Sequence, residues 1–407
     1  MGAGRKWAVV AVALAALAGA PSVARGGDEG QLLVAKGEIP EDRLVDVAID
    51  LFSPGVKEGD PSPLLKKGIR AAVRKSESRY VPIHLRNTLQ STGQWGAVRV
   101  APGGASWAEL LVTGTITKSN GKDLAMRVTA KDASGRVWVE RDYKQGADTA
   151  AYAKDRPVDG RDPFQALYNR IANDLVRARD KRKPAELVEM RDVARLRFAA
   201  GMAPDPYAAY LVTRGKGRVG VARLPAADDP MMARVAAIRD RDQMFVDTLN
   251  EYYADFYARM DKPYDDWRAY TYEEQAALDS INRAATLKKI LGGLAILGGI
   301  LMDPQSDRVG VKDVLVLGGI AAIQSGFEDG KETVIHKAAL TELADSFEGE
   351  VTPLLLDVDG KVVQLTGSAE AQFTQWRLLL QDIAATDAAL PANINLLPMA
   401  PAEVVQP

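Results

Sequence analysis

The sequence predicts an α+β protein, with a mixed sheet and flanking helices in the amino-terminal part and a mainly helical second half. Three observations predict this class. Short runs between residues 97 and 143 alternate apolar and polar side chains and are separated by turn sequences such as Asn120-Gly121, which is typical of antiparallel strands. Helical apolar stripes flank these runs at about 64–90 and 162–180. From Met231 onward, helical spacing dominates.

Each element of the amino-terminal half follows from a local pattern. Leu44 to Phe52 is an apolar run typical of a buried strand, and Asp162-Pro163 is typical of a helix start. Pro82 lies inside the first helical tract and is expected to kink it or to split it in two. We expect the order β-α-β-β-β-β-α, an α+β sandwich, with the later strands at 97–101, 109–117, 124–131 and 136–143.

The second half is expected to contain helices and one small hairpin. Helices are predicted at about 231–260, 273–301, 311–327, 331–347 and 369–383, and paired strands at 352–356 and 361–365. The predicted organisation is a signal peptide at 1–24, a flexible lead-in at 25–40, an α+β sandwich domain at 41–182, a linker or irregular subdomain at 183–229, a helical region at 230–350 with a Gly-rich hairpin at 286–327, a β-hairpin plus helix at 351–390, and a disordered tail at 391–407.

The first 24 residues have the three-part pattern of a secretory signal peptide. Arg5 and Lys6 precede an apolar run from Trp7 to Ala20, and Ser22-Val23-Ala24 supplies small residues at a cleavage site. We therefore expect an exported protein of the periplasm, which could be associated with a membrane. The sequence has no cysteine, so we do not expect a lipoprotein.

Composition narrows the function classes. The 407 residues are 47% hydrophobic and 26% charged, with a net charge of -2. This charge gives no overall positive potential that would attract nucleic acid. The lack of cysteine excludes thiolate zinc sites and thiol redox chemistry. Only His84 and His336 are present, and their scarcity argues against hydrolase or metal chemistry. We expect no enzyme activity, no cofactor and no metal.

Four tracts of the first domain carry a resemblance to a known fold. They are V-A-I-D-L-F at 47–52, Y-V-P-I-H-L-R-N-T-L-Q at 80–90, L-L-V-T-G-T-I at 110–116, and D-L-A-M-R-V-T-A-K-D-A-S-G-R-V-W at 123–138. Residues 44–180 resemble the periplasmic α/β domain shared by curli-secretion-channel proteins, the TolB amino-terminal domain and the outer-membrane activators of penicillin-binding proteins. The resemblance covers about a third of the chain and implies a protein-binding platform, with no catalytic motif to transfer.

A near-repeat of glycine-rich helical sequence stands out in the second half. Leu291-Gly292-Gly293-Leu294-Ala295 recurs as Leu317-Gly318-Gly319-Ile320-Ala321. At helical spacing, each copy presents a narrow face of small residues that lets two backbones approach closely. These faces are formed by Gly292, Ala295 and Gly299 and by Gly319, Ala322 and Gly326. The hairpin is expected either to insert into a membrane or to pack against helices of this chain or another subunit.

An aromatic and acidic cluster at 252–272 allows two interpretations. Tyr264, Asp265, Asp266 and Trp267 could form a ligand surface, because aromatic faces beside carboxylates stack on sugar rings. Peptidoglycan is a plausible envelope ligand, and paired carboxylates suit glycoside hydrolysis. The helical spacing of the aromatic residues instead favours an ordinary core stripe or a partner contact.

Two motif matches lack the context that their functions need. Gly215-Lys216-Gly217-Arg218-Val219-Gly220 matches a dinucleotide fingerprint, but no βαβ unit surrounds it, and we interpret it as a basic loop. Asp357-Val358-Asp359-Gly360 resembles the start of a calcium loop but lacks the later oxygen ligands, so we interpret it as a hairpin turn.

The sequence thus predicts a non-enzymatic envelope protein, an assembly accessory factor that binds other envelope proteins. Its Gly-rich hairpin is expected to mediate homo-oligomerisation or attachment to a membrane. One alternative is a peptidoglycan-binding or -modifying protein that uses the cluster at 252–272. Another alternative is a component of an outer-membrane channel.

Overall fold

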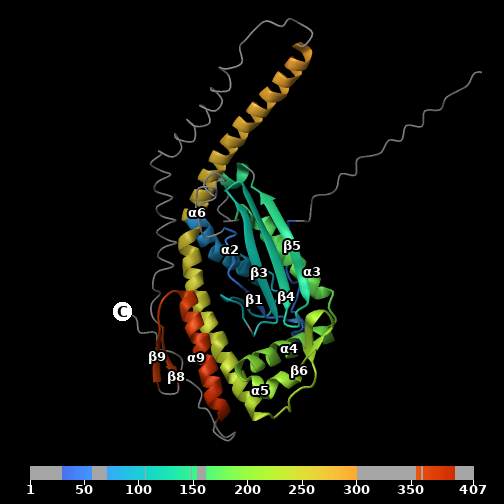
Figure 1. The fold of residues 1–407 in the computed structure, drawn as a ribbon, viewed down its shortest axis with the longest axis vertical. Coiled ribbons are helices and arrows are strands. Elements are labelled where there is room, and N and C mark those ends of the chain that lie inside the picture. The colour runs from blue at the N-terminus through green and yellow to red at the C-terminus, as the bar shows by residue number, and fades with distance from the viewer. Residues whose placement is uncertain are drawn as a thin grey trace, which may run out of the picture.

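The structure is a computed structural model that describes residues 30–56, 71–105, 107–147, 149–153, 162–299, 354–358 and 361–389. A five-stranded sheet lies beside a very long helix (Figure 1). The helices are α2 (Ala71–Ser91), α3 (Gln165–Asp180), α4 (Pro184–Met202), α5 (Pro204–Tyr207), α6 (Pro230–Gly299) and α9 (Ala369–Ala389). The strands are β1 (Val47–Ile49), β2 (Val98–Val100), β3 (Leu110–Ser119), β4 (Asp123–Asp132), β5 (Val137–Gly146), β6 (Leu211–Arg214), β7 (Arg218–Val221), β8 (Leu354–Val358) and β9 (Lys361–Leu365).

The sheet is mixed, as predicted, and its strand order is β2-β1-β3-β4-β5. Strand β1 pairs in parallel with both of its neighbours, β2 and β3. Its parallel pairing with β2 is possible because helix α2 carries the chain back between the two strands. Strands β3, β4 and β5 form an antiparallel meander. The predicted order β-α-β-β-β-β-α over the first domain is confirmed, and Gly121 takes a positive φ of 72° in the turn between β3 and β4.

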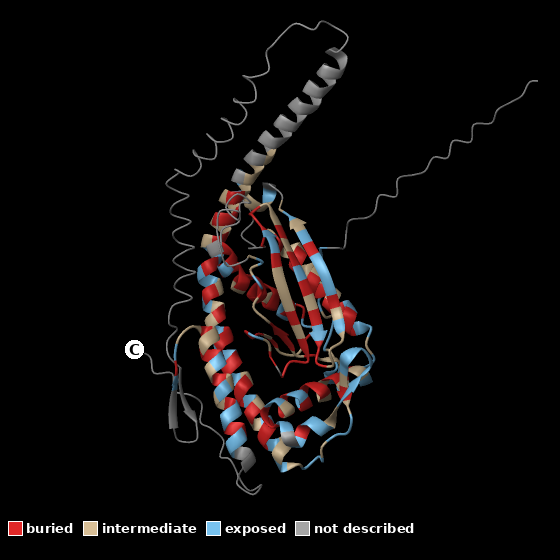
Figure 2. Cartoon of the chain, viewed as in Figure 1, coloured by how far each residue is buried: buried red, intermediate tan, exposed pale blue. Residues whose placement is uncertain are grey.

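The two faces of the meander differ in burial. Along β4, Met126 and Val128 are buried, whereas Arg127 and Lys131 are exposed on the other face (Figure 2). The buried face meets α2 and α3, whose apolar residues Leu85 and Ile171 belong to the same core. The alternation of apolar and polar residues along the strands therefore indicates a sheet that is covered by helices on one face.

A second core joins α2 to the long helix α6 and to α9. In α2, Leu85 packs toward the sheet, whereas Tyr80 and Ile83 belong to the core that contains Tyr253 of α6 and Trp376 of α9. Helix α2 thus lies between the sheet and α6. This arrangement explains why α2 is buried on most of its surface and shows no single apolar stripe.

Three predicted features of the helices are corrected by the structure. Helix α2 is one element and is not split at Pro82. The segment 183–229, predicted as a linker or irregular subdomain, contains the regular helix α4, which buries Leu187, Met190 and Val193 at helical spacing between charged residues. The helices predicted at 231–260 and 273–301 are one helix, α6, which continues through Pro263.

The continuity of α6 has a packing reason. Met260, Tyr264 and Trp267 are buried on both sides of Pro263. Their spacing keeps one apolar face against the body of the protein across the proline. This packing offsets the hydrogen bond that a proline removes from a helix interior.

The carboxy-terminal elements agree with the sequence pattern. Strands β8 and β9 pair antiparallel, and α9 buries Phe373, Trp376 and Leu380 as its spacing predicts. In the described part of the chain, no helix carries an apolar stretch long enough to cross a bilayer. The predicted signal peptide, the predicted tail and the second half of the predicted Gly-rich hairpin lie outside the described residues.

Candidate functional site

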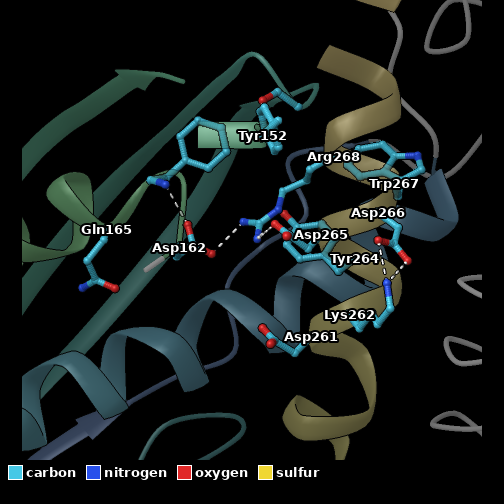
Figure 3. A network of polar contacts seen from close by, with 12 residues as sticks. Tyr152, Asp162, Gln165, Asp261, Lys262, Tyr264, Asp265, Asp266, Trp267 and Arg268 are labelled. Atoms are coloured by element: carbon cyan, nitrogen blue, oxygen red, sulfur yellow. Dashed lines mark hydrogen bonds and ion pairs between the residues drawn. The ribbon is translucent and has the colours of Figure 1, made fainter. Parts of the chain in front are cut away.

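A buried network of polar side chains joins α6 to the sheet domain. It is formed by the part of α6 from Tyr257 to Asp279, by α2, by the start of α3 and by the turn between β3 and β4. Figure 3 shows the part of it around Arg268 and Asp162. This network contains the aromatic and acidic cluster that the sequence marks as notable. We therefore describe it contact by contact.

A buried ion pair joins Arg268 of α6 to Asp162. Arg268 Nη1 donates to Asp162 Oδ2 at 2.7 Å, and the two side chains are only 2% and 3% exposed. Asp162 Oδ1 also accepts from the backbone N–H of Phe164, ahead of α3. Burial acts to raise the pKa of Asp162, but the charge of Arg268 and the hydrogen bonds from Arg268 and the Phe164 N–H outweigh it, and the pKa lies below its ordinary value.

The aromatic ring of Tyr264 lies beneath Arg268 and links it to a second buried carboxylate. The Arg268 guanidinium lies 4.3 Å from the centre of the Tyr264 ring, and Tyr264 Oη donates to Glu77 Oε1 at 2.7 Å. Arg74 Nε lies 3.5 Å from Glu77 Oε2. Burial raises the pKa of Glu77, and the positive charge of Arg74 opposes that rise.

His84 belongs to the same network and is held at both ring nitrogens. Its Nδ1 lies 2.6 Å from Tyr257 Oη, and its Nε2 lies 2.9 Å from Gln165 Oε1. Because an amide oxygen only accepts, Nε2 carries the hydrogen and Nδ1 accepts from Tyr257. Tyr80 stacks on Tyr257 at 4.6 Å between ring centres and donates to Asp261 at 3.0 Å. His84 is therefore a structural residue in this arrangement.

The turn between β3 and β4 presses directly on α6. A Cβ atom added at Gly121 would lie 2.3 Å from the carbonyl oxygen of Arg268, so only glycine fits there. Lys122 forms an ion pair with Asp279 on the next turns of α6. Tyr152 Oη donates to the carbonyl oxygen of Gly121 at 2.6 Å and its ring packs on Tyr272.

At the other end of this interface, α6 covers the edge of the sheet. Asn250 of α6 accepts from the Val100 N–H at 2.8 Å and donates to the Val100 carbonyl at 2.9 Å. Its side chain thus occupies the hydrogen-bonding edge of β2, as a neighbouring strand would. Arg99 on the same strand pairs with Asp247 at 2.6 Å. Together these contacts fix both the position and the rotation of α6 on the domain.

The structure changes the interpretation of the predicted ligand surface. Tyr264 and Trp267 are buried, so their ring faces are not available to a sugar. Asp265 pairs with Arg268 at 3.2 Å, and Asp266 pairs with the exposed Lys262 at 2.8 Å. The prediction of one exposed surface made of these four residues is therefore wrong. The alternative interpretation of the aromatic stripe as core is confirmed for Tyr253, Tyr264 and Trp267.

Of the six small residues of the predicted Gly-rich hairpin, three lie among the described residues and three do not. Gly292, Ala295 and Gly299 lie in α6, of which the structure gives the backbone at these positions. Gly319, Ala322 and Gly326 lie outside the described residues. The hairpin itself therefore stays a prediction.

The glycine motif at 215–220 forms the tip of a β-hairpin. Strands β6 and β7 pair antiparallel on either side of a 3-10 turn at Gly215–Gly217. Lys216 takes a φ of 64°, in the left-handed region, and Val219 N–H donates to the Ser134 carbonyl at 2.8 Å. The expected basic loop is present without the βαβ unit that a dinucleotide site requires.

Sequence reasoning missed the residues that carry the network. Arg268, Glu77 and Asn250 have no motif, since their role depends on which elements pack together. Asp162 and Gly121 had local signals as a helix start and a turn, but neither signal predicts a contact with α6. No group of three or more His, Asp or Glu side chains is placed to hold a metal ion within the described ranges.

The network thus connects the sheet domain to the long helix, and its Arg268–Asp162 and Arg74–Glu77 pairs are buried inside the protein. Comparisons of the chain with protein-family models, with curated proteins and with solved structures found no match.

Proposed function

We propose that this protein is a non-enzymatic, exported assembly factor of the cell envelope that contacts other proteins or a membrane through the distal end of α6. The observation that carries the proposal is the length of this helix, 70 residues. At 1.5 Å per residue it is about 105 Å long. In Figure 1, α6 continues well beyond the sheet before it ends.

The distal part of α6 carries the small residues. The contact of Asp279 with Lys122 is the one furthest along α6 among the described side chains. The helix backbone then continues for about 30 Å to Gly299. Gly292, Ala295 and Gly299 lie in this part, on one face by their spacing. Glycine costs about 1 kcal/mol against alanine in a helix interior, which favours a close contact with another helix.

The contacts between α6 and the sheet domain also support this proposal. Contacts hold α6 in two regions, at Asn250 and around Arg268, where the turn at Gly121 also packs. A force or a rotation applied at the distal end would therefore be transmitted to the sheet domain. The proposal accordingly assigns the domain to a second partner, at the β5 edge, since the β2 edge is occupied by Asn250.

The experiment is a double substitution of the small-residue faces, Gly292→Leu with Gly319→Leu. The oligomeric state is measured by light scattering, and membrane attachment by an alkaline wash of membranes from cells that express the full chain. We expect the wild type to self-associate or to stay in the washed pellet, and the double variant to lose that property. Gly201→Leu is the matched control, because Gly201 lies in α4 with open space around it.

Two outcomes contradict the proposal. One is a double variant that keeps both its oligomeric state and its membrane partitioning. The other is a wild-type chain that is monomeric and is released by the wash. Export is tested separately by fractionation and by amino-terminal sequencing of the mature protein, which we expect to begin at Arg25. A start at Met1 in the cytoplasmic fraction contradicts export.

A further inference from the structure

A second site lies at the opposite end of the sheet domain from the distal part of α6. A cavity of about 220 Å³ is enclosed by the turn between β4 and β5, helix α4 and the hairpin β6–β7. It is lined by four arginines, Arg136, Arg182, Arg214 and Arg218, and by three acidic residues, Asp132, Glu186 and Glu189. The side chains that line it therefore carry a formal charge of +1.

All three acidic residues are already bound by donors of the protein. Asp132 accepts from Ser134 Oγ at 2.6 Å and from Trp138 Nε1 at 2.7 Å. Glu186 pairs with Arg136 at 2.8 Å, and Glu189 pairs with Arg214 at 2.7 Å. These pairs use two of the four arginines.

The other two arginines are not in contact with a carboxylate, although the hydrogen bond from Arg136 and, to a lesser extent, the charge of Arg182 lower the pKa of Glu186. Within the part of the chain that the structure describes, Arg182 and Arg218 form no ion pair, and the buried Nε of Arg182 has no hydrogen-bond acceptor. The Arg182 guanidinium lies 5.8 Å from the centre of the Trp138 ring, which holds its plane in place. The Nη groups of Arg182 and Arg218 have no hydrogen-bond acceptor among the described residues. These donors can therefore bind a negatively charged acceptor that enters the cavity.

The walls of the cavity are fixed before any ligand enters. Val219 N–H donates to the Ser134 carbonyl and ties the hairpin β6–β7 to the turn between β4 and β5. Arg214 also donates to the Val221 carbonyl at 3.2 Å and packs over Gly220. Pre-organised donors lose less entropy when they bind an anion.

We propose that this cavity binds a phosphate-class oxyanion through Arg182 and Arg218. The charge of the lining and the unused guanidinium donors define the class, because planar guanidinium groups match the oxygens of phosphate. The volume is below the 300–1,000 Å³ of typical drug-sized pockets. It therefore suits a single phosphate group, either free or at the end of a larger molecule.

The experiment is a calorimetric titration of the full chain with inorganic phosphate at constant ionic strength, with chloride as the reference anion. We expect saturable binding by the wild type and affinity that is about tenfold weaker or worse in the variants Arg218→Met and Arg182→Met. Arg218 is exposed, so its substitution should leave the fold intact. Arg127→Met is the matched control, because it removes one arginine from the open face of the sheet, where Arg127 pairs with Glu140.

The outcomes separate specific binding from general charge attraction. Equal losses in all three variants, or no saturable binding by the wild type, overturn the proposal. Two further titrations identify the source of the phosphate if it binds. Glycerol 3-phosphate presents a soluble phosphate monoester, and vesicles that contain phosphatidic acid present the same group on a membrane. Binding to either one that is lost in Arg218→Met supports the site and assigns its source.

Discussion

The backbone N–H of Phe52 donates a hydrogen bond of 2.9 Å to the carbonyl oxygen of Ser78, inside helix α2. Ser78 lies four residues before Pro82, so its carbonyl is the one that the proline cannot satisfy. The chain that follows β1 supplies the missing donor. This contact explains why α2 continues through Pro82 in one piece, against the expectation from sequence that it could split there.

The first prediction concerns this exchange of donors. In Pro82→Ala, the new N–H at position 82 competes with Phe52 for the Ser78 carbonyl. The loss of buried ring methylenes, about 0.8 kcal/mol each, is offset by better helix propensity. We expect a small change in the free energy of unfolding but faster hydrogen exchange at the Phe52 amide. Pro263→Ala is the control and should leave that amide unchanged. An unaltered Phe52 exchange rate in Pro82→Ala would contradict this account.

The second prediction concerns the ion pair of Arg268 with Asp162. Arg268→Met leaves a buried carboxylate without its partner, which costs about 3–5 kcal/mol of stability. Urea unfolding followed by tryptophan fluorescence measures the loss. Lys262→Met, in a pair whose lysine is 83% exposed, should cost no more than about 1 kcal/mol. Adding Asp162→Asn to Arg268→Met should recover part of the lost stability. A double variant that is less stable than Arg268→Met would show that the pair is not the cause.

The third prediction tests the contact of the turn between β3 and β4 with α6. Gly121 and Gly103 have nearly the same φ, +72° and +71°, but only Gly121 faces the backbone of α6. In each alanine variant the positive φ costs about 1 kcal/mol at the turn that holds the residue. Gly121→Ala must in addition move the turn between β3 and β4 away from Arg268. We expect faster hydrogen exchange along 268–279 in Gly121→Ala alone. Equal effects of the two substitutions would mean that the turn does not hold the helix.

The fourth prediction is a pH dependence at the interface of α6 and α9. Asp242 of α6 is fully buried, with Arg377 of α9 at 3.5 Å. Burial raises the pKa of Asp242 to about 6, and the charge of Arg377 opposes that rise. Because the pKa is higher in the folded state than in the unfolded state, the charged form opposes docking of α9. Stability from this group is therefore present at low pH and is lost as the pH rises through about 6.

The size of that effect follows from the shift. A rise from 3.8 to about 6 corresponds to a contribution on the order of 3 kcal/mol. The measurement is chemical unfolding between pH 4 and pH 8 for the wild type and for Asp242→Asn. The substitution should flatten this part of the pH profile and stabilise the protein at pH 8. Asp240→Asn, at an exposed position two residues earlier, is the control. A profile with the same slope in Asp242→Asn and wild type would assign the dependence to other groups.

Local sequence patterns were sufficient to predict an element whose type depends on residues close together in the sequence. The alternation along 124–131 identified β4, and Asn120-Gly121 identified its turn. The spacing of Phe373, Trp376 and Leu380 identified α9. These signals are reliable because a face that meets the core must repeat with the period of its element.

The same patterns did not correctly predict two helices that pack against several other elements of the fold. Helix α4 was missed because charged residues such as Arg191 and Arg197 separate its apolar positions, and these arginines bond to Glu109 and to the Ala133 carbonyl within the fold. The continuity of α6 was missed because Pro263 is a strong local signal for a helix end. Its packing on both sides of the proline overrides that signal.

The sequence by itself determined the class of the fold, the order of the elements in the sheet domain and the existence of an aromatic stripe at 252–272, because these depend on local period and turn chemistry. Only the tertiary structure decided that this stripe faces inward, that Arg268 meets Asp162 and that Asn250 closes the edge of β2. The reason is physical. The two partners of each contact lie more than 100 positions apart, and they meet only once burial of apolar surface has placed α6 on the sheet domain.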